Sequence, residues 1–333
     1  MLSKLEKIPD INEEAVVVYA YLQMLEKWLR EMVYVELKAK KGNSWFNFHK
    51  TKNTYDSDKK YTHMSTPESS PLSYLSFGEL QKLIKNNWEI FSPYLPPQNI
   101  WDAKLEEIDN IRNRIAHFRS LHEQDLNRVL QFLRDIDQGF WRFCTSYNDS
   151  FTVLPADNDS VTNKFADLDP FFPKQIDEKR WVTVGHAPPD LLYIVSIRVI
   201  RRLWCDTSDK IEGTPGYLYD LNIVIRGQRQ YDYKRFLSAS KKLHSKFVHI
   251  CLDHQSNSIR ITIPANYGSE EVINIIEQLI EITEHTIIPS RGIVDIDDTS
   301  VKKLADEWPE YVLSPKNPLT FLDSEMPCSF FNA

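Results

Sequence analysis

The residue types best suited to chemistry lie in one short segment, which contains Arg112, Asn113 and His117. Cleavage of RNA without a metal needs a base for the 2′-hydroxyl proton and an acid for the leaving 5′-oxygen. It also needs positive charge beside the phosphate. Because histidine and arginine supply these groups, the segment predicts acid–base chemistry on a phosphodiester, with these three residues as the candidate catalytic set.

The spacing within this segment indicates how many copies a complete site needs. On a helix, Asn113 and His117 are four residues apart and share a face, so the amide could orient the imidazole or contact a phosphate oxygen. Arg112 lies about 140° around the helix from His117, because a turn contains 3.6 residues. Two copies that meet across a two-fold axis would gather both histidines and both arginines around one cleft. We therefore expect a homodimer.

Two roles are open for the charged residues around this segment. Arg114 and Arg119 are candidate RNA-binding residues, or they belong to a solvated cationic helix face. The preceding acidic residues could orient Arg112 or tune His117, or they could simply pair with nearby cations; they are Glu106, Glu107 and Asp109. The whole motif could also be an ordinary exposed helix face on which His117 caps a turn.

A second candidate RNA-binding region lies between residues 38 and 60, where cations alternate with aromatic residues. Positive charge combined with stacking rings suits single-stranded RNA, so we expect Lys50, Lys52 and Trp45 to bind it. The alternative is a soluble loop whose aromatic side chains anchor it to the helical bundle. The cations are Lys38, Lys40, Lys41, His49, Lys50, Lys52, Lys59 and Lys60, and the rings are those of Trp45, Phe46, Phe48 and Tyr55.

The N-terminal part of the chain has the pattern of a helical bundle. Apolar residues recur every three or four positions in four segments, which predicts four amphipathic helices. Ser76 and Glu79 form a capping-box pattern at the start of the second. Residues 42–74 lack this periodicity, and we expect a long loop there. The predicted helices cover residues 12–38, 77–92, 99–118 and 123–147.

Beyond residue 180 the apolar period changes to two, which is typical of strands. We expect an order of strand, strand, helix, strand, strand, helix, and therefore an α+β fold with a mostly antiparallel sheet. The chain should form a helical domain at 1–148, a connector at 149–180, and an α+β domain at 181–333 that senses a trigger or recruits substrate. The predicted strands are 195–199, 221–225, 247–252 and 258–263, and the helices are 233–246 and 272–280.

Composition excludes several classes of protein. The formal net charge of −7 gives no general attraction to nucleic acid, so RNA binding would need a local basic surface. The four cysteines are widely spaced, which argues against a disulfide framework or a cysteine-rich zinc site. His249, Cys251 and Asp253 alternate along a predicted strand, but no second ligand pair accompanies them, and we expect neither a metal nor a cofactor. With no signal peptide or membrane span, we expect a cytoplasmic protein.

The segment from Ile108 to His117 resembles the signature of the HEPN superfamily, in which a histidine follows an arginine after four to six residues. Four residues intervene here, and Asn113 gives the common arginine–asparagine variant. The surrounding helices resemble those of Abi-type and Swt1-type HEPN domains of bacterial defence proteins, over residues 10–148. This resemblance implies a dimeric endoribonuclease that acts as a toxin or anti-phage effector, with an antitoxin or a phage-derived trigger as a possible partner.

One position departs from a related pattern. In HEPN toxins paired with nucleotidyltransferase antitoxins, a tyrosine two residues beyond the histidine is the modified group. Arg119 occupies that position here, so this form of regulation is not expected, and Arg119 resembles an additional phosphate contact. Some HEPN domains bind RNA or partners without cutting, and a non-catalytic RNA-binding or dimerisation protein is the alternative function.

Overall fold

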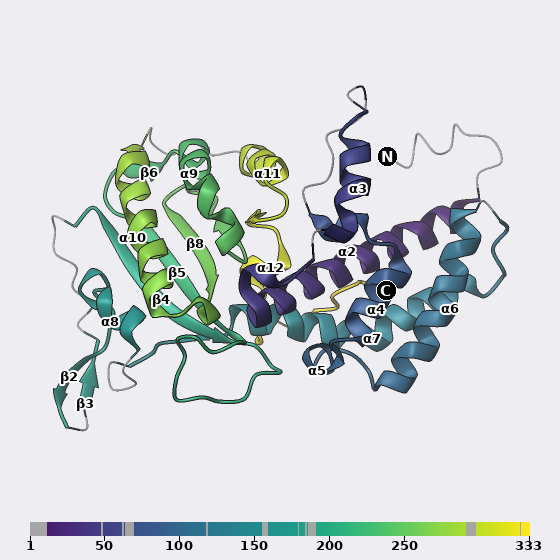
Figure 1. Cartoon of the computed structure of the whole chain (residues 1–333), viewed down its shortest axis with the longest axis horizontal. Helices are drawn as coiled ribbons and strands as arrows, with labels where there is room; N and C mark the ends of the chain where they lie inside the picture. The colour runs from purple at the N-terminus through teal and green to yellow at the C-terminus, as the bar shows by residue number, and fades with distance from the viewer. Residues whose placement is uncertain are drawn as a thin grey trace. The chain divides into compact units, whose positions relative to one another are not determined.

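The computed structural model describes most of the chain, and its elements fall into two compact units (Figure 1). Unit 1 comprises Met1–Val33, Leu75–Phe143 and Pro327–Ala333; unit 2 comprises Tyr34–Tyr74 and Cys144–Met326. The predicted division into a helical domain at 1–148, a connector at 149–180 and an α+β domain at 181–333 stays a prediction. The described residues are 12–47, 49–61, 63, 70–117, 119–154, 159–178, 180–183, 185, 191–290, 298–326 and 328–333; at 49–50 and 298–300 only the backbone is described.

Unit 1 is built from helices, as the apolar periodicity predicts. Three of the four predicted helices are single helices, whereas the predicted helix at 77–92 is divided at Asn86 and Asn87 into α4 and α5. The buried faces of these helices carry the leucine, isoleucine and aromatic residues of the predicted stripes. In the described part of the chain, no helix combines the length and the apolar character needed to cross a bilayer. The helices that contribute to unit 1 are α2 (Glu13–Lys41, up to Val33), α4 (Phe77–Lys85), α5 (Trp88–Phe91), α6 (Gln98–Ala116) and α7 (Asp125–Asn148, up to Phe143).

The start of α4 is fixed by a capping box, which confirms the prediction made from its sequence. The Ser76 hydroxyl accepts a hydrogen bond from the Glu79 backbone N–H at 3.3 Å. The Glu79 carboxylate in turn accepts the Ser76 backbone N–H at 2.8 Å. Both bonds satisfy N–H groups that have no partner within the helix.

Helix α6 is shorter at its C-terminal end than the periodicity predicts. The last helical residue is Ala116, and His117 follows as the C-cap with φ −103° and ψ 18°. The backbone N–H of His117 still donates to the Asn113 carbonyl at 3.2 Å. Phe118, the last residue of the predicted helix, lies outside the described residues. His117 is thus attached to the final turn but not contained in it.

Segment 328–333 completes the aromatic core of unit 1. Ring centroids lie 4.8 Å apart for Trp28 and Phe330, and 5.0 Å apart for Phe140 and Phe331. The Asp137 carboxylate accepts the backbone N–H groups of Phe330 and Phe331 at 2.9 and 2.8 Å. The core of the N-terminal helices therefore includes residues from the far end of the chain.

Unit 2 contains a mixed sheet that is antiparallel at all but one of its pairings. Within the described residues, this sheet has six strands in the order β1-β4-β5-β8-β7-β10, and only β7 and β10 run parallel. The four predicted strands are all present. The strands are β1 (Ser150–Phe151), β4 (Tyr193–Arg201), β5 (Tyr217–Ile225), β7 (Ile250–Leu252), β8 (Ser258–Pro264) and β10 (Val312–Leu313).

The two faces of this sheet follow from the period-two alternation of its strands. On β8, the isoleucine side chains at 259, 261 and 263 belong to the apolar core. Arg260 and Thr262 alternate with them and make polar contacts on the opposite face. One strand therefore supplies both a hydrophobic layer and a polar one.

Helices pack on the apolar face of the sheet (Figure 1) and contribute to the same core. They are α8 (Ser160–Lys164), α9 (Tyr233–Ser240), α10 (Ser269–Thr286) and α11 (Asp298–Glu307). Helix α9 continues as a 3₁₀ helix, η5 (Lys241–Lys246). The remaining described elements of residues 144–326 are η4 (Ala166–Leu168), β2 (Lys174–Asp177), β3 (Arg180–Val182), β6 (Arg229–Tyr231), η6 (Ala265–Tyr267), β9 (Ile287–Pro289) and α12 (Pro318–Phe321).

The prediction of a long loop at 42–74 is wrong for part of this segment. Residues His49–Asp58 form helix α3, flanked by the short 3₁₀ helices η1 (Gly42–Ser44) and η2 (Pro71–Tyr74). Among the α3 side chains that are described, only that of Thr51 is buried. A helix that buries so little has no apolar stripe, which is why periodicity did not reveal it.

A fully buried ion pair in unit 2 joins α2 to the residue that follows β4. The Glu36 and Arg202 side chains are both 0% exposed, with Arg202 Nε 3.0 Å and Nη2 2.5 Å from Glu36 Oε1. The indole N–H of Trp204 donates to Glu36 Oε2 at 2.6 Å. These bonds compensate the loss of hydration that both charges suffer on burial.

Replacing one partner of this pair should strongly destabilise the protein. In Glu36→Ala the guanidinium of Arg202 stays buried without its carboxylate, and we expect the free energy of unfolding to fall by about 3–5 kcal/mol. Urea unfolding followed by circular dichroism measures this loss. The control is Glu277→Ala, which breaks an exposed pair with Lys164 and should cost at most about 1 kcal/mol. Equal losses in the two variants would contradict the expectation.

His244 is a buried histidine in unit 2 that the fold keeps neutral. Its Nε2 lies 3.0 Å from the Ser240 hydroxyl, and its ring makes an edge contact with Trp308 at 5.0 Å. Burial lowers the pKa of His244 to about 4, and the nearby Lys241 charge contributes to this lowering. The unfolded chain therefore binds a proton more readily than the folded chain does.

This difference predicts an acid-sensitive contribution to stability. His244 has no effect above its unfolded pKa of 6.5, and it destabilises the fold by about 1.4 kcal/mol per pH unit as the pH falls towards 4. Denaturant unfolding at pH 7, 6 and 5 should show a smaller acid-induced loss in His244→Phe than in the wild type. Glu310, whose pKa burial raises to about 7, acts in the opposite direction in both proteins. Parallel pH profiles would contradict the assignment.

Candidate functional site

Arg112 projects from α6 into a defined environment within unit 1. Its Nε lies 3.4 Å from Glu26 Oε2, and its guanidinium carbon lies 5.5 Å from the centre of the Phe77 ring. The side chain is 34% exposed. An ion pair and a cation–π contact therefore restrict the guanidinium while part of it remains open to solvent.

Glu26 holds a second arginine as well as Arg112. The Arg30 guanidinium, one turn later on α2, is also ion-paired with Glu26, and its Nη2 donates to the Leu75 carbonyl at 2.9 Å. One carboxylate thus links α2 to α6. Its position determines where the Arg112 charge lies.

Asn113 is bonded within its own helix. Its amide nitrogen donates to Asp109 Oδ2 at 3.3 Å. The bond that joins Asn113 to His117 is a backbone bond, from the His117 N–H to the Asn113 carbonyl, and it does not involve the side-chain amide that was predicted to orient the imidazole. Asp109 was predicted to pair with Arg112 or to tune His117. In the structure it instead orients the amide of Asn113.

His117 is exposed to solvent at the end of α6. A residue that exchanges protons with an external substrate must be reachable, and the structure meets this condition. A histidine sealed inside the helices would have excluded such a role. Arg112 precedes it within the last two turns of the helix, so both residues belong to the same end of α6.

Arg114 forms a close ion pair with the start of α7. Its guanidinium binds Asp125 through two nitrogens, with Nη2 2.5 Å from Oδ1 and Nε 3.2 Å from Oδ2. The Asp125 side chain is 3% exposed and also accepts the His122 backbone N–H at 2.9 Å. This pair closes the connection between α6 and α7. Arg119 lies in that connection, and its side chain is exposed.

The hollow beside this pair is lined by more acidic than basic side chains. Arg128 at its edge is already paired with Glu107, and Arg114 is paired with Asp125. Excess negative charge does not favour a phosphate group there. The lining residues are Ala103, Glu106, Glu107, Asn110, Ile111, Arg114, His122, Glu123, Gln124, Asp125 and Arg128.

The second predicted RNA-binding region lies in unit 2, and its residues differ in accessibility. Trp45 is only 4% exposed and makes an edge contact with Tyr34 at 5.1 Å, which is the anchoring role that the sequence left open. Lys52 on α3 is exposed. Lys50 is also part of α3, but its side chain lies outside the described residues.

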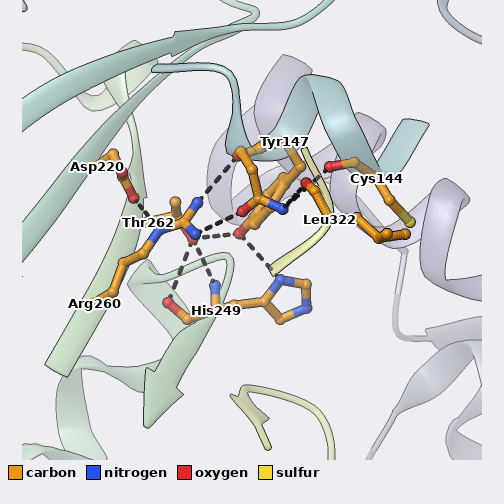
Figure 2. Close-up of polar contacts among 8 residues, drawn as sticks. Cys144, Tyr147, Asp220, His249, Arg260, Thr262 and Leu322 are labelled. Carbon is orange, nitrogen blue, oxygen red and sulfur yellow. Dashed lines mark hydrogen bonds and ion pairs between the residues drawn. The ribbon is translucent and has the colours of Figure 1, made fainter. Parts of the chain in front are cut away.

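A second polar cluster is buried on the other face of the unit 2 sheet (Figure 2). The Tyr147 hydroxyl contacts Thr262 and lies 3.1 Å from His249 Nδ1. Arg260 donates to Asp220 at 2.6 Å and to the Tyr147 carbonyl at 3.1 Å. The cluster fastens the last turn of α7 to strands β5 and β8.

The burial of this cluster indicates that it stabilises the fold and does not contact a substrate. Tyr147, His249 and Thr262 are at most 1% exposed. Burial raises the pKa of Tyr147 well above its usual value and that of Cys251 to about 11, so neither group ionises near neutral pH. Among the described residues, no three His, Cys, Asp or Glu side chains are arranged to hold a metal.

The sequence did not identify the two carboxylates that position the arginines of α6. Glu26 and Asp125 are far from the motif in sequence, and helical spacing pointed instead to Glu106, Glu107 and Asp109. A signal for Glu26 was present, because it stands directly beside the apolar stripe at Leu25 and Leu29. A charged residue at such a position often faces a cation on the packed helix.

Comparison with known proteins supports the resemblance seen in the motif. Residues 20–137 match the family of Swt1-like HEPN domains. This segment includes Arg112, Glu26, Phe77 and His117, and the HEPN resemblance predicted for the N-terminal region is confirmed. No curated protein and no solved structure matches the chain.

The shared role of Glu26 predicts a measurable effect on unit 1. Glu26→Gln keeps the shape of the side chain but removes the charge that both arginines contact, so we expect the free energy of unfolding to fall by about 1–3 kcal/mol. Urea unfolding followed by circular dichroism tests this. Glu14→Gln removes one charge at an exposed position of the same helix and should change stability by less than about 0.5 kcal/mol. No loss in Glu26→Gln would show that the contact is unimportant.

Proposed function

We propose that the chain is a metal-independent endoribonuclease in which Arg112, Asn113 and His117 form the catalytic motif. The observation that carries this proposal is the exposed position of His117 at the end of α6, close in sequence to a restrained and partly exposed Arg112. The match to Swt1-like HEPN domains supports it, because HEPN domains are often ribonucleases.

The proposed reaction is an internal transfer at phosphorus. The ribose 2′-oxygen attacks the adjacent phosphorus atom, a base accepts its proton, and the bond to the 5′-oxygen breaks. An acid then supplies a proton to that leaving oxygen. The products are a 2′,3′-cyclic phosphate and a 5′-hydroxyl. Arg112 stabilises the negative charge that builds up on the phosphate oxygens.

Two copies of the chain complete the proposed site. A single imidazole cannot accept one proton and donate another on opposite sides of the phosphorus at the same moment. In a symmetric dimer, His117 of each copy takes one role, and the two Arg112 side chains lie beside the phosphate. Arg119 and Lys52, which are exposed, are the proposed RNA contacts best placed to reach a substrate; Arg114, Lys50 and Trp45 complete the predicted set.

The proposed biological role is that of a defence or toxin effector. The HEPN dimer cuts RNA, and the α+β part of the chain senses a trigger or recruits substrate. Arg119 stands where some HEPN toxins carry the modified tyrosine, so control by modification of that tyrosine is not part of the proposal.

Cleavage in the presence of a chelator tests the enzymatic proposal. Purified wild-type protein should cut single-stranded RNA in excess EDTA, and the fragments should carry 2′,3′-cyclic phosphate and 5′-hydroxyl ends. His117→Ala should lower the rate at least roughly 100-fold because it removes both the acid and the base. Arg112→Ala should lower the rate while leaving the protein folded.

A neighbouring histidine provides the matched control. His122 is also exposed, so His122→Ala should retain the wild-type rate. Strict dependence on Mg²⁺, or equal rates for His117→Ala and the wild type, would refute the proposal.

A non-catalytic role in RNA binding or dimerisation is the second candidate function. It is favoured by the geometry of Asn113, whose amide bonds to Asp109 rather than to the imidazole of His117. If this role is correct, the wild type binds RNA without cutting it, and His117→Ala has no effect on binding.

A further inference from the structure

One side of α9 and η5 in unit 2 carries a concentration of positive charge. Helical spacing places residues 234, 238, 241 and 242 on a common side. The cations of this segment that are exposed define what we call the α9 basic face: Lys234, Arg235, Lys241 and Lys242.

The opposite side of the same segment is anchored in the apolar core. Phe236, Leu237 and Phe247 are each 0% exposed, and His244 is 2% exposed. The N-terminus of α9 is capped by Asp232, whose carboxylate accepts the Arg235 backbone N–H at 3.1 Å. The α9 basic face is therefore presented by a fixed backbone.

These cations differ from many others in the chain because no carboxylate of the described residues pairs with them. Arg114, Arg128, Arg202 and Arg260 all form ion pairs. Within the described part of the chain, no residue of the α9 basic face forms a salt bridge. The ammonium group of Lys241 instead lies 5.5 Å above the Trp308 ring.

The neighbouring charges limit the extent of this face. Lys246, at the end of η5, is paired with Glu271 at 2.9 Å. Helix α11 carries exposed lysines but also exposed Asp306 and Glu307, so it adds little net charge. Among the described residues of this segment, the exposed cations without an ion pair therefore lie between 234 and 242.

The spacing of the cations suits a polyanion better than a single anion. Lys234 and Lys241 are seven residues apart, which corresponds to roughly 10 Å along a helix. Ser238 lies between them on the same side and is exposed. Lysine, arginine and serine side chains are common contacts to nucleic-acid phosphates.

We propose that the α9 basic face binds the phosphate backbone of single-stranded RNA and recruits it to the protein. This proposal rests on the proposed ribonuclease function, since it names where unit 2 would hold the substrate. Binding through phosphates is independent of base sequence and weakens as salt increases. The chain as a whole has a net charge of −7, so this local surface supplies the attraction that the overall charge does not.

The composition of the face favours RNA over a membrane surface. A helix that binds a lipid interface exposes large apolar side chains beside its cations. The large apolar residues of α9 are Tyr233, Phe236 and Leu237, and all are buried. The exposed residues of α9 are its two cations, Ser238 and the small Ala239. The face therefore lacks the apolar groups that would insert into a bilayer.

The test measures binding separately from cleavage. His117→Ala in the full chain serves as the binding background, and a fluorescein-labelled 20-nucleotide single-stranded RNA is titrated by fluorescence anisotropy between 50 and 200 mM NaCl. Adding Lys234→Gln, Arg235→Gln, Lys241→Gln and Lys242→Gln together should weaken binding at least roughly tenfold at 50 mM NaCl. The slope of log affinity against log salt should fall by roughly 3, as expected for four lost phosphate contacts.

A charge-matched control separates this local effect from the loss of net charge. Lys174→Gln, Arg198→Gln, Lys210→Gln and Arg229→Gln remove four exposed cations elsewhere in unit 2 and should leave affinity within about twofold of the background protein. Circular dichroism melting should show that both combined variants remain folded.

The outcomes test RNA recruitment by the α9 basic face separately from the ribonuclease activity. Unchanged affinity and slope in the α9 variant, equal losses in both variants, or binding to anionic vesicles without binding to RNA would overturn the recruitment proposal. Cleavage of a tetranucleotide by protein with intact His117 tests the nuclease separately. RNA binding that depends on the α9 basic face without any cleavage would support recruitment and refute the nuclease.

Discussion

The ion pair between Glu26 and Arg112 is the interaction on which the candidate site depends. It connects α2 to α6 and determines where the guanidinium lies relative to the end of the helix. The same carboxylate holds Arg30, which contacts the backbone at Leu75. The position of one charged group at the site is thus tied to the packing of three segments of unit 1. Without this contact the helices would still pack through their apolar stripes, but the guanidinium of Arg112 would not be held in one position.

Many cations with defined neighbours in this protein have a structural function. Arg114 closes the connection between α6 and α7, Arg202 is buried against Glu36, and Arg260 joins the last turn of α7, which belongs to unit 2, to the sheet of that unit. A count of basic residues therefore says little about nucleic-acid binding here. The charges available to a substrate are the exposed cations that form no ion pair among the described residues, together with Arg112, whose pair with Glu26 leaves part of the guanidinium open to solvent. Only the structure separates these cations from the structural ones.

Local patterns in the sequence were sufficient to predict three of the four helical segments of unit 1 as single helices, the capping box at Ser76 and the main strands of unit 2, but not the break between α4 and α5. Each depends on residues close together in the chain, so periodicity or a short motif reveals it. The contacts of Arg112 and Arg114 could not be predicted in this way, because Glu26 and Asp125 approach them only after the helices pack. The same reason applies to strand β10.

Two other features, helix α3 and the burial of Phe330 and Phe331, are not predicted by local patterns for different physical reasons. Among the described side chains of helix α3, almost none is buried. The helix therefore has no apolar stripe, and apolar periodicity does not predict it. Phe330 and Phe331 enter the core of unit 1 from an irregular segment held by Asp137. Their burial depends on a tertiary contact that no local pattern encodes. The motif at 112–117 was recognisable because its residues are neighbours, whereas the charges that position it are not.

The end of α6 at Ala116 has a consequence for how such motifs vary. Arg112 is fixed by the register of a helix, whereas His117 stands just past its last residue, where the backbone has left helical geometry. A side chain in that position is carried by the connecting segment, so an added residue need not rotate it by about 100° as it would inside a helix. An arrangement of this kind makes the direction of the histidine less dependent on helical register than that of the arginine.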